Sequence, residues 1–93
     1  DTGLDVKKMA TNLKEKYPDG HLLRITFENK NSEEPILYEI INKLNIPINI
    51  VSANIKNTQA GALGVMYIHI KMRSDIGIVL EEFAKYGVKA EVI

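Results

Sequence analysis

The sequence lacks cysteine altogether, and it carries no excess of either charge. Without a thiolate the chain cannot form disulfides, zinc knuckles or iron–sulfur clusters of its own, and we expect no metal or cofactor in it. Its 12 basic and 12 acidic residues cancel. This balance argues against nucleic acid as a partner, because proteins that bind it usually carry a basic excess. All apolar runs are shorter than the roughly 20 residues that span a bilayer, so direct membrane insertion is not expected.

What the sequence does contain is the balance of a globular domain. Of its 93 residues, 45% are apolar and 26% are charged, which predicts one domain with one modest core. Apolar residues at i, i+3, i+4 and i+7 predict a helix over 5–16, and a turn follows at 17–20. We interpret residues 1–19 as a linker and lead-in helix from an upstream region, and residues 20–93 as the domain proper.

Beyond residue 20 the hydrophobic pattern switches between strand and helix. Alternating apolar residues predict strands at 21–28, 48–56, 63–72 and 88–92, with a polar connection at 57–62. Helical spacing predicts two helices between them, with Ser32 and Ser74 as N-caps and Gly87 as a C-terminal cap. The order βαββαβ with right-handed crossovers predicts an α+β, ferredoxin-like fold. In this fold a four-stranded antiparallel sheet, in strand order 4-1-3-2, carries two helices on one face.

The sheet face away from the two helices is predicted to be unusually apolar. Alternation places Leu22, Val65 and Tyr67 there, and we expect Ile48 and Ile50 to join them. Scattered surface apolar residues would explain this content, as would a face covered by a dimer partner, a ligand or the upstream helix. Residues 48–51 also form an uncharged stretch of an edge strand, which favours a homodimer.

No catalytic constellation is visible. His21 and His69 are the only histidines, and no acid or nucleophile is spaced to form a triad with either, so both are expected to be surface residues. The glycine-containing segment 61–64 lacks the lysine of a phosphate-binding loop and precedes a strand rather than a helix. Tyr67 is the only aromatic candidate for stacking a nucleic-acid base on the sheet. We therefore expect no enzyme activity from this chain.

Asn49 is out of place for a strand, because it lies between Ile48 and Ile50 and asparagine is depleted in strands. Its amide could simply hydrogen-bond the backbone of the preceding turn. It could instead hold a ligand, because an amide presents both donors and acceptors and suits the headgroup of an amino acid.

Several short segments, in this order and spacing, carry a resemblance to a known family. They are residues 22–27, 35–37, 49–53, 64–66 and 87–92. On these segments, residues 20–93 resemble the NIL domain family, best known at the C-terminus of the ATPase subunit of bacterial methionine importers. The motif that names the family is Asn-Ile-Leu, and this chain has Asn49, Ile50 and, as a conservative change, Val51.

The resemblance implies a regulatory module that binds L-methionine at or near a dimer interface and restrains transport when the cytoplasmic pool is full. It implies an upstream ATPase domain, where ATP would bind, a membrane permease as a further partner, and a location at the cytoplasmic face of the cell membrane. Walker A, signature and Walker B sequences are absent from this chain.

The resemblance also implies where the ligand would bind. It makes Asn49 the polar anchor for methionine, and Ile50, Ser52, Gly64 and Val65 follow from their proximity on paired strands. Two other classes of function stay open: a homodimerisation or protein-interaction module without ligand binding, and a small enzyme or nucleic-acid binder on the same fold.

Overall fold

The computed structural model describes residues 2–28, 36–59, 61–71 and 75–93. Within these residues the helices are α1 (Thr2–Lys16), α2 (Ile36–Leu44) and α3 (Ile76–Lys85). The strands are β1 (His21–Glu28), β2 (Ile48–Thr58), β3 (Gly61–Ile70) and β4 (Lys89–Val92).

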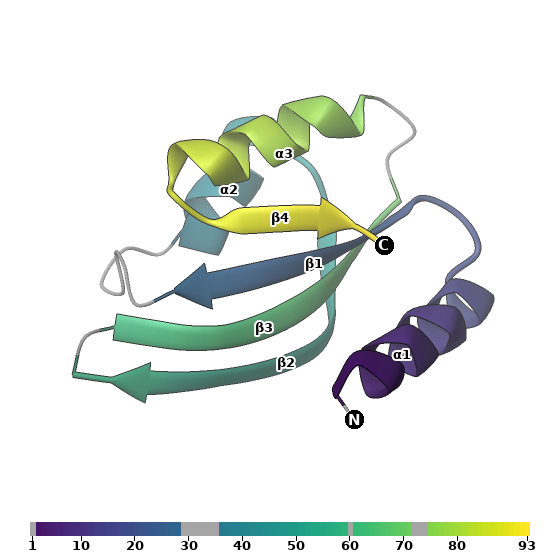
Figure 1. The fold of residues 1–93 in the computed structure, drawn as a ribbon. Helices are drawn as coiled ribbons and strands as arrows, with labels where there is room; N and C mark the ends of the chain where they lie inside the picture. The colour runs from purple at the N-terminus through teal and green to yellow at the C-terminus, as the bar shows by residue number, and fades with distance from the viewer. Residues whose placement is uncertain (1, 29–35, 60, 72–74) are drawn as a thin grey trace.

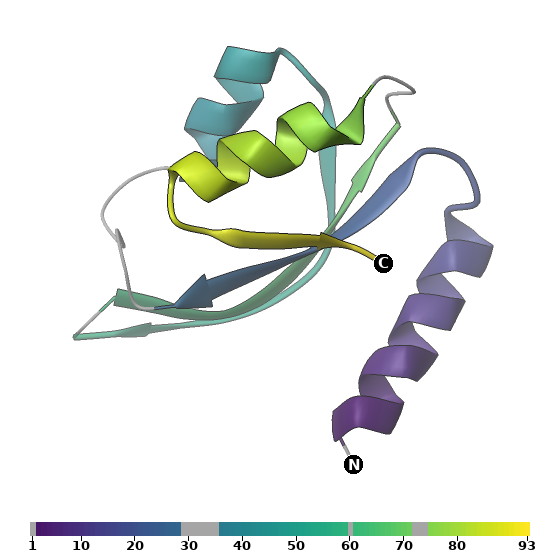
Figure 2. The same cartoon turned by 45° about the horizontal axis from the view of Figure 1, so that its top comes forward.

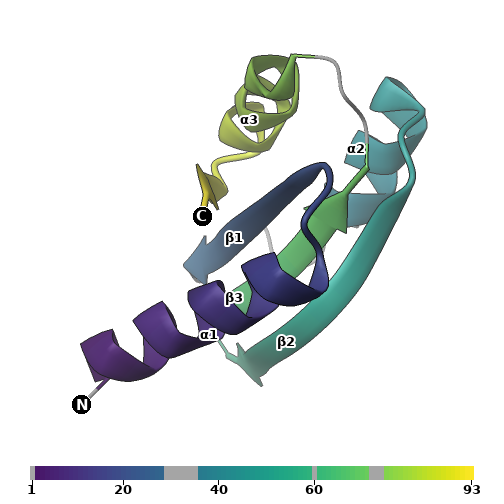
Figure 3. The ribbon, with the colours of Figure 1, turned by 90° about the vertical axis from the view of Figure 1, so that its right-hand side faces the viewer.

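The four strands form one antiparallel sheet in the order β2-β3-β1-β4, which confirms the predicted α+β, ferredoxin-like arrangement with its N-terminal helix. Helices α2 and α3 cover one face of the sheet (Figure 1). Helix α1 lies on the opposite side, with its C-terminal end near the sheet and its N-terminal end directed away from it (Figures 2 and 3). We call the two sides the helix-covered face and the α1 face.

The core lies between the sheet and the pair α2 and α3. On β1, Leu23 and Ile25 alternate toward the helices and are fully buried, as the sequence pattern predicts. On α3, Val79 and Phe83 are one helical turn apart and are also fully buried. These side chains meet in one hydrophobic cluster, which fixes how α3 sits on the sheet.

Helix α3 has a defined cap at each end. Its N-cap is Asp75, whose carboxylate accepts a hydrogen bond from the Gly77 backbone N–H at 2.8 Å. The predicted N-cap at Ser74 is therefore wrong by one residue, because the carboxylate is the group that reaches the helix N–H. Ser74 itself lies outside the described residues, as does Ser32. The predicted cap at Gly87 is confirmed. Gly87 has φ +72°, its N–H donates to the carbonyl of Ala84, and the N–H of Val88 donates to the carbonyl of Phe83.

The β2–β3 hairpin is longer than the sequence predicts. The strands are paired as far as Thr58 and Gly61, so most of the predicted connection 57–62 belongs to the ladder. Polar residues such as Asn57 continue the strand because cross-strand hydrogen bonds outweigh weak strand propensity. At its other end β3 stops at Ile70, and residue 72 of the predicted strand lies outside the described residues.

Two irregularities shape this hairpin. The pairing register shifts between Ile50 and Ser52, so that one extra residue is accommodated in β2. Further along, Gly64 of β3 has φ +151°, and a Cβ atom there would overlap the carbonyl oxygen of Asn54 and come within 2.7 Å of the Cα of Ile55. Glycine is therefore required at residue 64 both by its conformation and by the close approach of β2.

One carboxylate ties the two covering helices together. Glu82 of α3 is 5% exposed, and its Oε1 accepts a hydrogen bond from Lys85 Nζ at 2.9 Å. Lys43 Nζ of α2 forms an ion pair with Oε2 at 3.3 Å. The hydrogen bond from Lys85, assisted by Lys43, lowers the pKa of Glu82 below its ordinary value of 4.5, although burial opposes the shift. The same hydrogen bond raises the pKa of Lys85.

We expect Glu82→Gln to destabilise the domain and to flatten its response to acid. A carboxyl whose pKa falls on folding stabilises the fold above its unfolded pKa and loses that contribution as pH drops through the lower, folded pKa. Thermal unfolding followed by circular dichroism from neutral pH to below 4.5 checks this. The control Glu81→Gln, at the exposed neighbouring position, should keep the wild-type profile. Parallel pH profiles for wild type and Glu82→Gln would contradict the assignment.

Gly64→Ala should destabilise the domain by about 1–3 kcal/mol, because the added methyl group meets backbone atoms that cannot move aside. Urea denaturation measures the change. Gly77→Ala in the first turn of α3 is the matched control, since the nearest atom there is the carboxylate of Asp75, at 2.9 Å, which can rotate. Equal stability of the Gly64→Ala variant and the wild type would show that β2 retreats from residue 64 at no cost.

Candidate functional site

Asn49 and Ser52 lie on the same face of the sheet because of the register shift between them. Asn49 pairs with His69 and Ser52 pairs with Tyr67, and both partners lie on the α1 face. In a regular strand, residues three apart point to opposite faces. The extra residue in β2 restores the match. Both Asn49 and Ser52 are exposed, so their polar groups are open to a ligand or a second molecule.

Ile50 lies on the other side of the strand. It pairs with Ile68, whose side chain is in the core cluster, and Ile48 packs against the same cluster. The expectation that Ile48 and Ile50 join the α1 face is therefore wrong. These side chains extend the helix-covered face to the edge of the sheet, where the core ends and Ile50 is left 52% exposed.

Gly64 and Val65 lie further along the hairpin than Asn49. Val65 pairs with Asn54 and Thr26 on the α1 face and is partly buried. Gly64 pairs with Ile55 and Phe27 at the point where β2 approaches most closely. The structure thus brings Asn49, Ser52 and Val65 onto one face, whereas Ile50 lies on the other and Gly64 contributes only backbone.

A hollow of about 190 Å³ lies beside Asn49, where β2 begins and β3 ends. It is lined by Pro47, Ile48, Asn49, His69 and Lys71. An amide, an ammonium group and apolar carbon therefore surround one small space. Only Asn49 was among the site residues predicted from the sequence; Pro47, Ile48, His69 and Lys71 were not. Lys71 could have been found from the sequence, because it follows His69 by two positions and so continues the alternation of β3 on the same face.

The hollow is small and open. Pockets that enclose a small-molecule ligand usually measure roughly 300–1,000 Å³. At about 190 Å³ this space could hold part of a small amphipathic molecule but leaves the rest exposed. A complete binding site there needs one more wall.

His69 is not the surface residue that the sequence suggests. It is 4% exposed, its Nε2 lies 2.6 Å from the carbonyl oxygen of Asp19, and its ring contacts the ring of Tyr17 at 4.8 Å between centroids. Residues 17–20 and the end of α1 thus cover this part of the α1 face (Figure 3). Leu22 and Tyr67 on the same face are also buried. The sequence left several explanations open for the apolar residues on the α1 face. At this end of the sheet, the N-terminal helix and the segment after it provide the cover.

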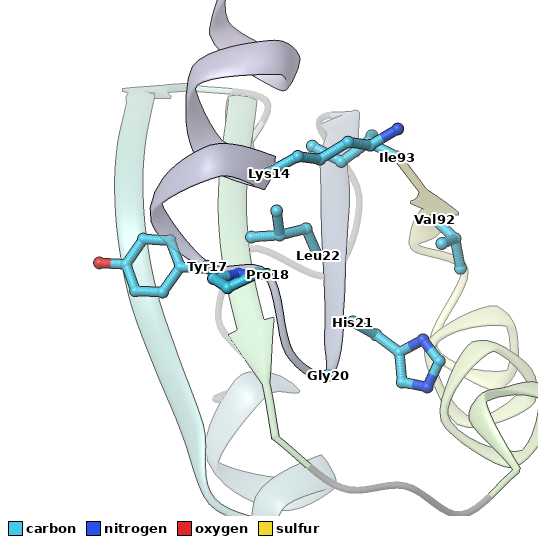
Figure 4. Close-up of a pocket in the computed structure, with 8 residues that line it drawn as sticks. All are labelled: Lys14, Tyr17, Pro18, Gly20, His21, Leu22, Val92 and Ile93. Carbon is cyan, nitrogen blue, oxygen red and sulfur yellow. The ribbon is translucent and has the colours of Figure 1, made fainter.

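A second hollow, of about 260 Å³, lies where α1 meets the sheet. Figure 4 shows the side chain of Lys14 directed toward Ile93, with Leu22 below both in this view. The lining residues are Lys14, Tyr17, Pro18, Gly20, His21, Leu22, Val92 and Ile93. They come from both ends of the chain, so no local sequence pattern could identify them together.

The part of the α1 face next to β4 is charged. Arg24 forms an ion pair with Glu91 at 3.2 Å, and Lys89 lies 3.8 Å from the same carboxylate. The hydrogen bond to Glu91 raises the pKa of Arg24, with burial opposing it. The pair is partly exposed, so its contribution to stability is small. The charged groups beside Tyr67 are therefore paired with each other and do not form a reactive group.

The described part of the chain holds no cluster of three or more metal-ligating side chains. None of its helices has both the length and the apolar character needed to cross a membrane. The polar groups that line the smaller hollow are the amide of Asn49, the imidazole of His69 and the ammonium group of Lys71.

Comparison with known sequences identifies relatives across almost the whole chain. Residues 21–92 match the family model described as NIL domain. The chain is 30% identical over 91 residues to the methionine import ATP-binding protein MetN 2 of Bacillus licheniformis, which covers 97% of this chain and 27% of that protein. It is 31% identical over 94 residues to MetN 2 of Enterococcus faecalis, which covers 100% of this chain and 26% of that protein. The chain thus spans about a quarter of the length of these curated relatives.

A solved structure has the same fold. It is the crystal structure of the C-terminal domain of an ABC transporter/ATP-binding protein from Enterococcus faecalis, and it superposes on this chain with a TM-score of 0.78. The two chains are 29% identical, and the match covers 89% of this chain and 93% of the other.

Proposed function

The chain belongs to the NIL domain family, and from that membership we propose that it is the regulatory, L-methionine-binding domain of the ATP-binding subunit of a methionine importer. The observation that carries the proposal is the position of Asn49 on the α1 face, at a hollow that Lys71 also lines. Relatives named as methionine import ATP-binding proteins support methionine as the ligand.

The groups around the hollow suit an amino acid with an apolar side chain. The ammonium group of Lys71 attracts a carboxylate, and the amide of Asn49 can accept from an ammonium group or donate to a carboxylate. Pro47 and Ile48 supply carbon surface of the kind that a polarisable thioether prefers. Val65 and Ser52, further along the same face, extend the surface available to the ligand.

The remaining functions belong to the parent protein. We propose that ATP binds to an upstream ATPase domain, that a membrane permease is the partner of the whole subunit, and that this chain lies at the cytoplasmic face of the membrane through that complex. The names of the relatives support this assembly. The domain itself needs no catalysis, because a regulator acts by binding its ligand more tightly in one state of the complex than in another.

A second copy of the chain is the proposed missing wall of the site. β2 is an edge strand, with Asn49 exposed beside the open hollow and Ile50 exposed on the opposite face. The start of this edge, residues 48–51, carries no charge that would block pairing with another strand. Two copies meeting along β2 would enclose ligands between them and link occupancy to their relative position. The same observation supports the alternative function, a homodimerisation module that binds no ligand, and calorimetry with L-methionine separates the two.

Asn49→Ala is expected to weaken L-methionine binding by roughly tenfold or more, the cost of losing a hydrogen bond to a charged group. Isothermal titration calorimetry on the full chain measures it. Asn42→Ala is the matched control, because Asn42 is also an exposed asparagine but lies on α2, which covers the opposite face of the sheet. Equal affinity of wild type and the Asn49→Ala variant would remove Asn49 from the site, and no heat with wild type would refute the ligand.

The chain should form dimers in a concentration-dependent manner, and Ile50→Lys should shift it toward monomer, because a charge on an edge strand blocks pairing. Light scattering coupled to size exclusion measures the mass. Ile78→Lys is the control, since Ile78 is 50% exposed on α3 and Ile50 is 52% exposed on β2. A wild-type monomer at high concentration, or an equal shift by both variants, contradicts the proposed interface.

A further inference from the structure

His69 takes part in two structural features, the contact with the segment before β1 and the hollow beside Asn49. Its imidazole Nε2 contacts the carbonyl oxygen of Asp19 and its ring contacts Tyr17, both in the segment between α1 and β1. The same residue lines the hollow beside Asn49, its cross-strand partner on β2. A ligand in this hollow would therefore lie against the residue that holds the end of α1.

The contact between His69 and the turn is directional. A carbonyl oxygen can only accept, so Nε2 must be the donor, and this fixes how the ring is oriented. With His69 only 4% exposed and the Nε2–O distance 2.6 Å, the ring has little freedom to turn without breaking the bond. The amide of Asn49 lies on the neighbouring strand, directly opposite.

The turn at residues 17–20, which His69 contacts, is tightly packed against the end of β3. Gly20 has φ +78°, and a Cβ atom there would overlap the carbonyl oxygen of Ile70 and lie 2.9 Å from the Cα of Lys71. On the other side of the turn, the Tyr17 N–H donates to the Leu13 carbonyl at 2.8 Å and so continues the helix. A shift of the His69 ring would therefore move the last turn of α1 rather than be absorbed by the connection.

The rest of α1 is weakly attached. Lys7, Lys8 and Met9 are exposed, and only Ala10 and Leu13 among the described side chains of the helix are partly buried. The orientation of α1 on the sheet thus depends on its final turn and on the contacts of Tyr17 and Asp19 with His69.

We propose that His69 is a positioning residue that couples ligand occupancy of the Asn49 hollow to the docking of α1. The inference rests on the proposed function, from which it takes L-methionine as the ligand. A ligand that packs against His69 restrains its ring in the orientation that binds Asp19, so the ligand and the docked helix stabilise each other. Linkage requires the effect to be reciprocal: docking of α1 strengthens ligand binding by the same factor by which the ligand strengthens docking.

Hydrogen exchange on the full wild-type chain tests the first half of this coupling. Saturating L-methionine should slow exchange of the backbone amides of α1 and of residues 17–20, although none of these residues lines the Asn49 hollow. A role of His69 in folding alone would not make α1 respond to the ligand. Unchanged exchange of α1, with binding verified by calorimetry, overturns the proposal.

Tyr17→Ala tests the reciprocal half. The substitution removes the ring contact with His69 but leaves every residue of the hollow intact. It should lower the affinity for L-methionine about fivefold or more, which is the lower end of measured allosteric couplings. Tyr38→Ala is the matched control, since Tyr38 is 65% exposed on α2, and it should bind like wild type.

The outcomes separate the two proposals. If wild type binds no L-methionine, the proposed function fails and this inference fails with it. If wild type binds and Asn49→Ala binds more weakly, while Tyr17→Ala folds and binds with wild-type affinity, only the coupling through His69 is overturned.

Discussion

Both faces of β3 must be covered, and the structure follows from how each is covered. Its residues from Met66 to Ile70 are all buried. Because successive side chains of a strand point to opposite sides, a continuous buried run means that neither face meets water. Helices α2 and α3 protect one face through the core cluster around Phe83. On the other face Tyr17 and Asp19 contact His69, which ties a helix outside the ferredoxin-like unit to β3, one of the two central strands.

Where this cover ends, the candidate site begins. The segment before β1 reaches as far as His69 on β3 and leaves the start of β2 open. The register shift in β2 then decides which side chains face the opening, since it puts Asn49 and Ser52 on one face and Ile50 on the other. The proposed ligand site and the proposed pairing with a second copy would both use this same edge of the sheet.

The sequence predicts those parts of the fold that depend on local periodicity. The alternation of β1, the helical spacing around Phe83 and the turn at Gly87 each follow from neighbouring residues, and the strand order follows from their succession. Asn49 is noticed because its amide conflicts with the apolar residues around it. The face of Ile50 could not be predicted, since a bulge reverses the alternation and no residue type marks it. Nor could the burial of His69, which depends on Asp19, 50 positions away in the chain.

The close contact of Gly20 with the backbone of β3 has a consequence for protein engineering. The connection from α1 into β1 is part of the folded unit, so a chimera that grafts this domain onto a foreign partner should be joined before Tyr17. Such a junction preserves the contacts of Tyr17 and Asp19 with His69, so the orientation of the fused partner is coupled directly to the sheet. A flexible spacer inserted within residues 17–20 would disturb the contacts of Tyr17 and Asp19 with His69 and so loosen the link between the sheet and the helix before it.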